Sequence, residues 1–253
     1  MKLDDIYRLI DLYAPFSLSD RLIEKEGGYD NSGVIAPVSG DVTGVLFALD
    51  LTVAAVEKAV SEGCNVIVTH HPAIYHPIKS VGGALNKAIA NGIGVISCHL
   101  NLDCAKYGVD YYFAKGLGAD KQEILCKLSE DEGYGRRFFL GKSLKEIRHR
   151  AEEVFNTTVL CYGHDSMHIN TVASFCGAGL SVEEVDVDCD LLCSCDVPHH
   201  VILKAVESNK ALLIFTHYSC ENYGLTKLYE AFPTFEGFDE TLKLYYFDDK
   251  RLF

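Results

Sequence analysis

Three short segments of the chain combine histidine with carboxylates or prolines after apolar runs. They are Thr69-His-His-Pro72, His99-Leu-Asn-Leu-Asp103 and His217-Tyr-Ser-Cys-Glu221. Together they offer four imidazoles and two carboxylates, which suit zinc, iron(II), manganese or cobalt. Such a set can hold two divalent ions with open positions for water or substrate. We therefore predict two divalent metal ions per chain, with these ligands: His70, His71, His99, Asp103, His217 and Glu221.

The spacing within two of the segments favours a common site. His99 precedes Asp103, and His217 precedes Glu221, by four residues. If each segment coils into a helical turn, its two side chains point the same way. A single histidine at a strand end is more commonly a hydrogen-bonded polar residue. Three such segments at similar places favour the metal-binding interpretation.

Two other arrangements of histidine are candidates for catalytic chemistry. His199 and His200 stand where a helix is expected to begin, and they are candidates for moving protons in catalysis. A structural role for them is equally open. Cys98 and His99 are a weaker candidate for a nucleophile pair, because neighbours on a strand point to opposite faces.

The elements that must position these residues alternate between strand and helix. In the first half we expect a helix at 2–13, then strand, helix, strand, helix and strand at 45–49, 52–62, 66–69, 82–91 and 94–98. Thr52 suits the N-cap of its helix. This βαβαβ order is typical of an α/β sheet, whose ligands collect beyond the carboxyl ends of the strands.

The second half repeats this alternation after a more polar stretch. Ser143 and Glu146 are spaced as a capping box that opens a helix to about Phe155. Further strands are expected at 171–176, 191–195, 212–216 and 242–247, with helices at 198–208 and 222–231. We predict two similar α/β domains with mixed sheets, residues 1–125 and 126–253. The C-terminal segment is free in this scheme to pack back on the first domain.

An internal similarity supports two related halves. Residues 54–71 align without gaps onto 201–218, and both segments read as helix, turn and apolar strand, then Thr-His. The identities are few, among them Thr69 with Thr216 and His70 with His217. Two such halves would each present a strand-end histidine. We therefore expect the metal site at the cleft between the domains.

The composition narrows the classes of partner. The net charge is −13. The basic clusters are short, and the one from Lys145 to Arg150 reads as a solvated helix face, so binding to nucleic acid is disfavoured. The first residues are amphipathic and acidic, unlike a signal peptide, and no apolar run is long enough to span a bilayer. We expect a cytoplasmic protein with mostly buried, reduced thiols for its ten cysteines. A zinc site at Cys189, Cys193 and Cys195 is a minor alternative.

At these motifs the sequence resembles the Nif-three-like family, often labelled GTP cyclohydrolase I type 2 homologues. The resemblance runs over almost the whole chain and is carried by the three segments above, by Asp30-Asn-Ser-Gly33, by Asp50, and by Pro77 and Lys79 after the His-His-Pro motif. It implies two α/β domains, a dinuclear metal site with the six ligands named above, and Asp103 or Glu221 as a bridge. It also implies a toroidal homohexamer with the metal sites facing an internal cavity.

The sequence departs from the family pattern at three places. Cys195-Asp196 replaces a Gly-Glu pair, Thr216 replaces a glycine before the last motif, and Cys176-Gly-Ala-Gly179 replaces a turn richer in Gly and Ser. The six candidate ligands are intact, but these changes affect the wall of the cavity. The choice of substrate therefore does not carry over from the family.

Two functions are compatible with these observations. The first is a metal-dependent hydrolase acting on a small, nucleotide-like substrate, with GTP cyclohydrolase type 2-like chemistry as the family label and a phosphoesterase as an equal use of the metals. The second is a non-enzymatic ring protein that stores, delivers or senses metal, or serves as an adaptor. A coordination sphere open to water beside an acid or base would favour the hydrolase.

Overall fold

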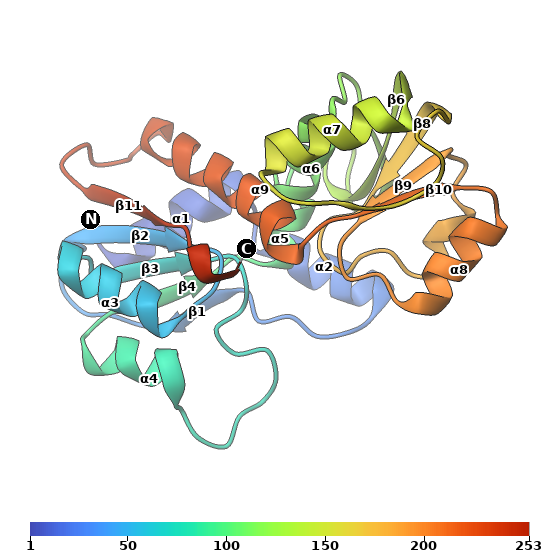
Figure 1. Ribbon diagram of the computed structural model, residues 1–253. Coiled ribbons are helices and arrows are strands. Elements are labelled where there is room, and N and C mark those ends of the chain that lie inside the picture. Colours follow the sequence, from blue (N-terminus) through green and yellow to red (C-terminus); the bar gives the residue numbers. More distant parts are fainter. Residues whose placement is uncertain (253) are drawn as a thin grey trace. The chain divides into compact units, whose positions relative to one another are not determined.

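The computed structural model describes residues 1–252 of the chain. They form two compact units (Figure 1): unit 1 comprises residues 1–105 and 225–252, and unit 2 comprises residues 106–224. Unit 2 thus begins at Lys106, whereas the domain scheme from the sequence begins the second domain at residue 126. Helix α9 (His217–Ala231) belongs to unit 2 in its first half and to unit 1 in its second.

Unit 1 is built on a five-stranded mixed sheet with the order β1-β4-β3-β2-β11. The strands are β1 (Gly33–Ala36), β2 (Gly44–Ala48), β3 (Val66–Thr69), β4 (Gly94–Ser97) and β11 (Lys243–Phe247). β2, β3, β4 and β11 run parallel, and β1 is antiparallel to β4. The sheet confirms the expected βαβαβ order, and β11 returns from the C-terminal segment to pair with β2.

Helices cover both faces of this sheet. Helices α3 (Val53–Glu62) and α4 (Gly83–Ala90) bury Ala, Val and Leu side chains against Leu46, Ile67 and Val95, which share one face (Figure 1). Thr52 caps α3 as expected, because its hydroxyl accepts the N–H of Ala55. On the other face, the ring of Phe47 packs edge-on against those of Tyr229 and Phe232. The remaining helices of unit 1 are α1 (Leu3–Tyr13), α2 (Ser17–Glu26) and α5 (Leu100–Cys104).

Unit 2 contains a six-stranded mixed sheet with the order β5-β6-β8-β9-β10-β7. The strands are β5 (Glu123–Lys127), β6 (Gly133–Ser143), β7 (Leu160–Tyr162), β8 (His168–Ser174), β9 (Leu191–Ser194) and β10 (Ala211–Ile214). β8, β9 and β10 run parallel, and the other pairings are antiparallel. Two mixed sheets in an α/β fold are therefore confirmed.

Helices again flank the sheet of unit 2. Helix α8 (His199–Glu207) packs Val201 and Ala205 on the face that carries Ala173, Leu192 and Leu212. Helices α6 (Val109–Leu117) and α7 (Leu144–Phe155) carry Phe113 and Phe155, whose rings pack edge-on against each other and against the ring of Phe215, the residue after β10. The expected capping box at Ser143 and Glu146 is present. The repeated segments become α3–β3 and α8–β10, which confirms helix followed by strand in each.

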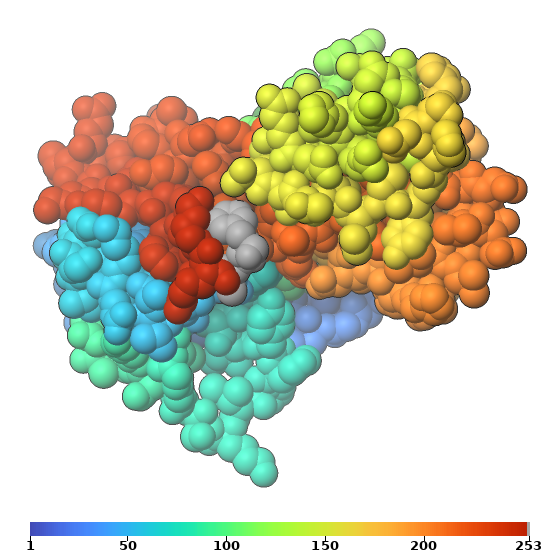
Figure 2. Space-filling model, viewed as in Figure 1, coloured from blue at the N-terminus to red at the C-terminus, as the bar shows by residue number. Residues whose placement is uncertain are grey.

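Three further features concern the surface and the cysteines. Residues 75–82 of the loop between β3 and α4 are exposed, and this teal loop projects from unit 1 (Figure 2). Among residues 1–252, no helix combines the length and apolarity needed to cross a membrane. All ten cysteines are free thiols in the structure, and eight of them are buried.

Candidate metal centre

The candidate groups of unit 1 gather at the carboxyl edge of its sheet. β2, β3 and β4 are parallel neighbours, so their carboxyl ends lie side by side. Asp50 follows β2, His70 and His71 follow β3, and His99 follows β4. Asp103 is added by α5, in which the N–H of Asp103 bonds to the carbonyl of His99 as in a helical turn. The expected coiling of this segment is thus confirmed.

These side chains form a compact, buried group. Ligand atoms of His70, His99 and Asp103 all lie within 4.8 Å of one another. Nε2 of His70 is 3.5 Å from Oδ1 of Asp103, and the ring of His71 lies 5.1 Å from that of His70 between centroids. His70 is fully buried, and Asp103 is 3% exposed. Buried histidines and a carboxylate at these distances are compatible with a metal site.

Each histidine of this group is oriented through its Nδ1 atom. Nδ1 of His70 lies 2.8 Å from the carbonyl oxygen of Cys98. Nδ1 of His71 lies 2.7 Å from Oδ1 of Asp50, and Nδ1 of His99 lies 2.7 Å from Oδ1 of Asp30. A histidine that binds metal commonly donates its other ring N–H to a carboxylate or carbonyl, which fixes the tautomer and the ring. The three acceptors therefore orient the rings as they are commonly oriented at metal sites, with Nδ1 engaged by an acceptor.

Asp30 reaches His99 because β1 pairs with β4. Gly33 is opposite Ser97 in that pairing, which brings the segment before β1 beside His99. Asp30 also accepts hydrogen bonds from the hydroxyls of Ser19 and Ser32. Burial by itself would raise the pKa of Asp30, but the hydrogen bonds from His99 and the two serines outweigh burial and lower it to about 2. Asp30 is thus a fixed anion at neutral pH.

The short helix α5 is held in place by one buried amide. Nδ2 of Asn101 donates to the carbonyl of Ala14, 2.8 Å away, and Asn101 is fully buried. Ala14 ends helix α1, so this bond ties α5 to the N-terminal helix of the same unit. The bond keeps Asp103 on the side of the helix that faces His70.

Unit 2 presents its own histidine and carboxylate at the start of α9. His217 and Glu221 are one turn apart, and Nε2 of His217 is 2.9 Å from Oε2 of Glu221. Nδ1 of His217 is 2.6 Å from Oδ2 of Asp196, which follows β9. Burial would lower the pKa of His217, but Glu221 and Asp196 outweigh burial and raise it to about 10. The two carboxylates beside His217 therefore strongly stabilise a positive charge on its imidazole ring.

The sequence predicts a helix that begins at residue 222, whereas α9 begins at His217. The hydroxyl of Thr216 accepts the N–H of Ser219, so Thr216 caps the first turn. The condition that the segment must coil is met, because α9 starts at His217 itself. The weak apolar periodicity of the first turn, with its His, Ser, Cys and Glu, concealed the start of the helix.

The turn that contains Gly177 lies directly against the carboxylate of Glu221. Gly177 has φ +54°, and a Cβ atom there would stand 2.3 Å from Oε1 of Glu221. The neighbouring Cys176 is buried, and its Sγ lies within 4.8 Å of a carboxylate oxygen of Glu221. Its N–H donates to Oδ1 of Asp110 over 3.1 Å, and its carbonyl accepts the hydroxyl of Tyr134. The backbone of this turn is thus fixed from two sides.

Sequence reasoning did not include several of these residues among the site residues. Asp30, Asp50 and Asp196 orient histidines, and Cys176 lies beside Glu221. Asp30 and Asp50 had entered only through motif resemblance, and Asp196 and Cys176 only as departures from the family pattern. Their positions depend on strand pairing and on loops, for which a single sequence gives no local signal. The available signal was the presence of aspartates close in sequence to the strands that neighbour each histidine: Asp30, Asp50 and Asp196 are such residues.

Two other sequence-based candidates lie elsewhere in unit 2. His199 and His200 are exposed in the first turn of α8, so their proposed part in proton transfer stays a prediction. Among Cys189, Cys193 and Cys195, burial raises the pKa of Cys193 well above its usual value, and burial raises that of Cys189 to about 11. Thiols that stay protonated are poor metal ligands. This favours the reduced, structural role expected for them.

The comparison with protein families covers nearly the entire chain. Residues 1–250 match the family described as Duf34/NIF3 (NGG1p interacting factor 3). The chain belongs to the Duf34/NIF3 family. The family resemblance seen in the sequence is therefore confirmed.

Similar proteins match this chain over most of its length. A "GTP cyclohydrolase 1 type 2 homolog" of Clostridium acetobutylicum is 30% identical over 238 residues, covering 87% of this chain and 85% of that protein. The crystal structure of the hypothetical protein SA1388 of Staphylococcus aureus superposes with a TM-score of 0.83 at 24% identity, covering 98% and 96% of the two chains. Reduced HcgD from Methanocaldococcus jannaschii gives a TM-score of 0.77 at 25% identity, covering 98% of each chain. The fold shared with these structures thus extends over both units.

Proposed function

We propose that this Duf34/NIF3 protein is a metal-dependent hydrolase of a small, nucleotide-like substrate. In this proposal two divalent ions are held by the six residues with which the sequence analysis began: His70, His71, His99, Asp103, His217 and Glu221. The names of relatives as GTP cyclohydrolase homologues motivate a guanine nucleotide as the first substrate to test.

One observation carries the proposal. All four candidate histidines place Nδ1 within 2.8 Å of an acceptor, either the carbonyl of Cys98 or the carboxylates of Asp50, Asp30 and Asp196. Structural histidines share no reason to adopt one orientation on three separate segments. Metal-binding histidines do, because the bond at Nδ1 leaves Nε2 free to coordinate and raises its basicity.

The donors fit divalent ions that accept nitrogen and oxygen ligands. A bound ion of this kind acts as a Lewis acid and lowers the pKa of water toward neutrality. The chain's own contribution is to hold and neutralise the charge: Asp103 and Glu221 supply anionic oxygens, and the low pKa of Asp30 keeps its carboxylate ionised. His199 and His200 are proposed to move protons.

Metal content is the decisive measurement. The full-length protein, purified without added metal or metal-binding tags, should contain about two ions per chain by elemental analysis. Glu221→Gln and His99→Ala should each lower that content, and the exposed His164→Ala should leave it unchanged. A Glu221 variant with full metal content would refute the ligand assignment.

Activity is tested separately on the metal-loaded protein. Release of formate from GTP would identify cyclohydrolysis, and release of phosphate from nucleotides and phosphate monoesters would identify a phosphoesterase. If the protein holds its metals and neither product forms, the non-enzymatic role in metal storage, delivery or sensing is the one that remains. The toroidal hexamer expected from the resemblance stays a prediction, which light scattering can measure.

A further inference from the structure

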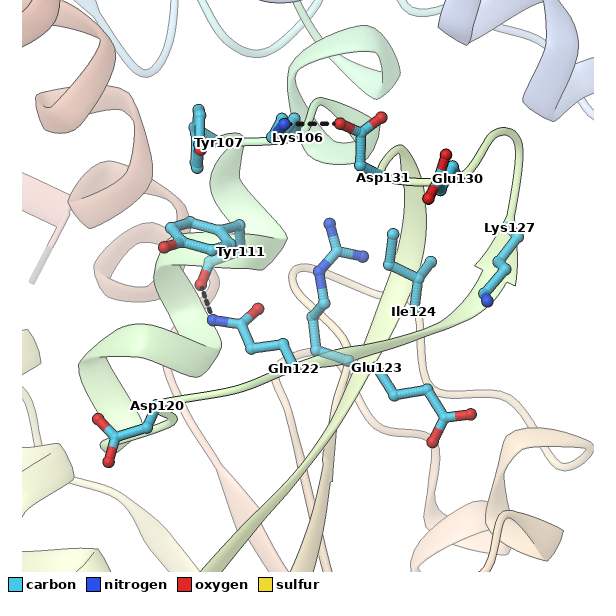
Figure 3. Close-up of a pocket in the computed structure, with 11 residues that line it drawn as sticks. Lys106, Tyr107, Tyr111, Asp120, Gln122, Glu123, Ile124, Lys127, Glu130 and Asp131 are labelled. Atoms are coloured by element: carbon cyan, nitrogen blue, oxygen red, sulfur yellow. Dashed lines mark hydrogen bonds and ion pairs between the residues drawn. The ribbon is translucent and has the colours of Figure 1, made fainter.

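A cavity lies wholly within unit 2 and shares no residue with the proposed metal ligands. It has a volume of about 280 Å³ and is formed where the start of α6 faces β5 and β6 (Figure 3). Its walls are formed by residues 106–107, 111, 120, 122–124, 127 and 130–131 and by Arg136. A water molecule occupies about 30 Å³ in the liquid, so the cavity has room for a small organic molecule.

Arg136 contributes a buried donor to this cavity. The residue is 1% exposed, and its Nη1 is 2.7 Å from the carbonyl of Gly133 and 3.4 Å from Oδ2 of Asp110. Within residues 1–252, Nη2 of Arg136 has no hydrogen-bond partner. A buried guanidinium N–H without an acceptor is costly, so a group that accepts its hydrogen bond would be stabilised there.

Gln122 contributes a buried acceptor to the same cavity. Its Nε2 donates to the carbonyl of Tyr111 at 3.1 Å, which fixes the orientation of the amide (Figure 3). The Oε1 atom is then left without a partner in the described part of the chain, although it is buried. The cavity therefore needs both an acceptor for Arg136 and a donor for Gln122.

The charges around the cavity restrict what can supply these groups. Four carboxylates and three cations line it, and one cation, Lys106, is already paired with Asp131 at 2.7 Å. Another carboxylate, that of Glu123, pairs with Arg137 outside the cavity at 3.4 Å. The walls therefore carry charges of both signs and no concentration of cations, which disfavours a phosphate or another polyanion. The unused donor of Arg136 equally disfavours a pure cation. Tyr107 and Tyr111, whose rings pack edge-on at 5.2 Å, add an apolar wall.

We propose that this cavity binds a small zwitterion of the amino-acid type. Its carboxylate accepts a hydrogen bond from Nη2 of Arg136, and its ammonium group donates to Oε1 of Gln122. An apolar or aromatic side chain lies against the two tyrosines. This site is independent of the proposed hydrolase function.

The test is calorimetric titration of the full-length protein with L-phenylalanine and L-leucine. Each amino acid should bind with a stoichiometry of one molecule per protein chain. L-phenylalaninamide, which lacks the carboxylate, and 3-phenylpropionate, which lacks the ammonium group, should bind at least tenfold more weakly than L-phenylalanine. Absence of binding by both amino acids would overturn the proposal, and so would equal binding of all three phenylalanine-like probes.

Variants locate the binding. Gln122→Leu and Arg136→Lys should each weaken L-phenylalanine at least fivefold, and Lys121→Ala and Arg148→Lys, which alter residues outside the cavity, should not. Because Arg136 is buried and its variant could fail to fold, the partly exposed Gln122 provides the second test. If Gln122→Leu binds as the unaltered protein does, the proposal is wrong.

Amino acids also chelate divalent metals, so the titration is repeated with Glu221→Gln. Binding in the cavity should survive this change with unaltered affinity. Binding that disappears with Glu221→Gln and is insensitive to Gln122→Leu would place the amino acid on the metals and overturn the proposal, whatever the outcome for the proposed hydrolase.

Discussion

Nδ1 of His99 lies 2.7 Å from Oδ1 of Asp30, although the two residues are 69 positions apart in the chain. The antiparallel pairing of β1 with β4 makes this contact, and Ser19 and Ser32 hold the carboxylate from its other side. The carboxylate fixes the imidazole so that Nε2 is the atom available to a metal.

Asp30→Asn should weaken metal binding about 10- to 100-fold, because the amide neither carries the charge nor raises the basicity of His99 as the carboxylate does. The measurement is competitive titration of the metal-free protein with a chromogenic chelator. Asp41→Asn is the matched control, since Asp41 is exposed and pairs with Lys2 in the same unit. Equal affinities of the two variants would contradict an orienting role for Asp30.

Gly177→Ala should both destabilise the protein and lower its metal content. The new Cβ would stand 2.3 Å from Oε1 of Glu221, and φ at this position is +54°. Gly141→Ala provides the control, because φ there is +61° with nothing within 4 Å of the added atom. That control should lose about 1–2 kcal/mol of unfolding free energy from backbone strain and no metal.

Urea unfolding and elemental analysis of these two glycine variants separate strain from contact. A larger loss of stability in Gly177→Ala, together with lost metal, is the expected result. Identical behaviour of the two variants would show that the close approach of Gly177 to Glu221 has no consequence for the site.

Asp110→Asn should lower the unfolding free energy by about 3–5 kcal/mol, because it leaves the buried guanidinium of Arg136 without its countercharge. The two residues are almost fully buried and their charged groups are 3.4 Å apart. Asp188→Asn is the control, because it breaks the ion pair between Arg137 and Asp188, whose side chain is 97% exposed. It should lower the unfolding free energy by no more than about 1 kcal/mol. Chemical denaturation measures both, and similar small losses would argue against a buried ion pair.

The free energy of unfolding should fall as the pH rises from about 9 to 11. Burial raises the pKa of Cys64 and of Cys189 to about 11, above the value near 9 of the unfolded chain. As the pH rises, the unfolded state therefore loses its thiol protons first. The contribution of these thiols to the unfolding free energy is fully present below pH 9 and is lost as the pH rises to about 11. Each thiol contributes a slope of up to about 1.4 kcal/mol per pH unit in that range.

Denaturation of Cys64→Ala and Cys189→Ala at pH 7 and pH 10 checks this. Either substitution should cost less stability at pH 10 than at pH 7, because the ionisable thiol is gone from the unfolded state as well. A cost that does not change with pH would mean that these thiols titrate alike in the folded and unfolded chain.

The sequence predicted much of the fold because its local signals were strong. The apolar runs that became β2, β3, β4, β9 and β10 are bounded by Gly, Asn or Asp, and the caps at Thr52 and Ser143 start helices where they were expected. Helices α2 and α6 and strands β1 and β5–β7 were not anticipated. Their half-exposed or irregular patterns carry weak periodicity, and they acquire their form by packing on neighbours.

The six proposed ligands were named from the sequence because histidine and carboxylate at strand ends, in motifs of fixed spacing, are visible locally. Sequence alone also determined the family. Only the tertiary structure revealed the acceptors at Nδ1: Asp30 reaches His99 through strand pairing, and Asp196 reaches His217 from the loop after β9. The cavity around Arg136 and Gln122 was hidden in the same way, since an unpaired buried atom is a property of packing and no spacing in the chain records it.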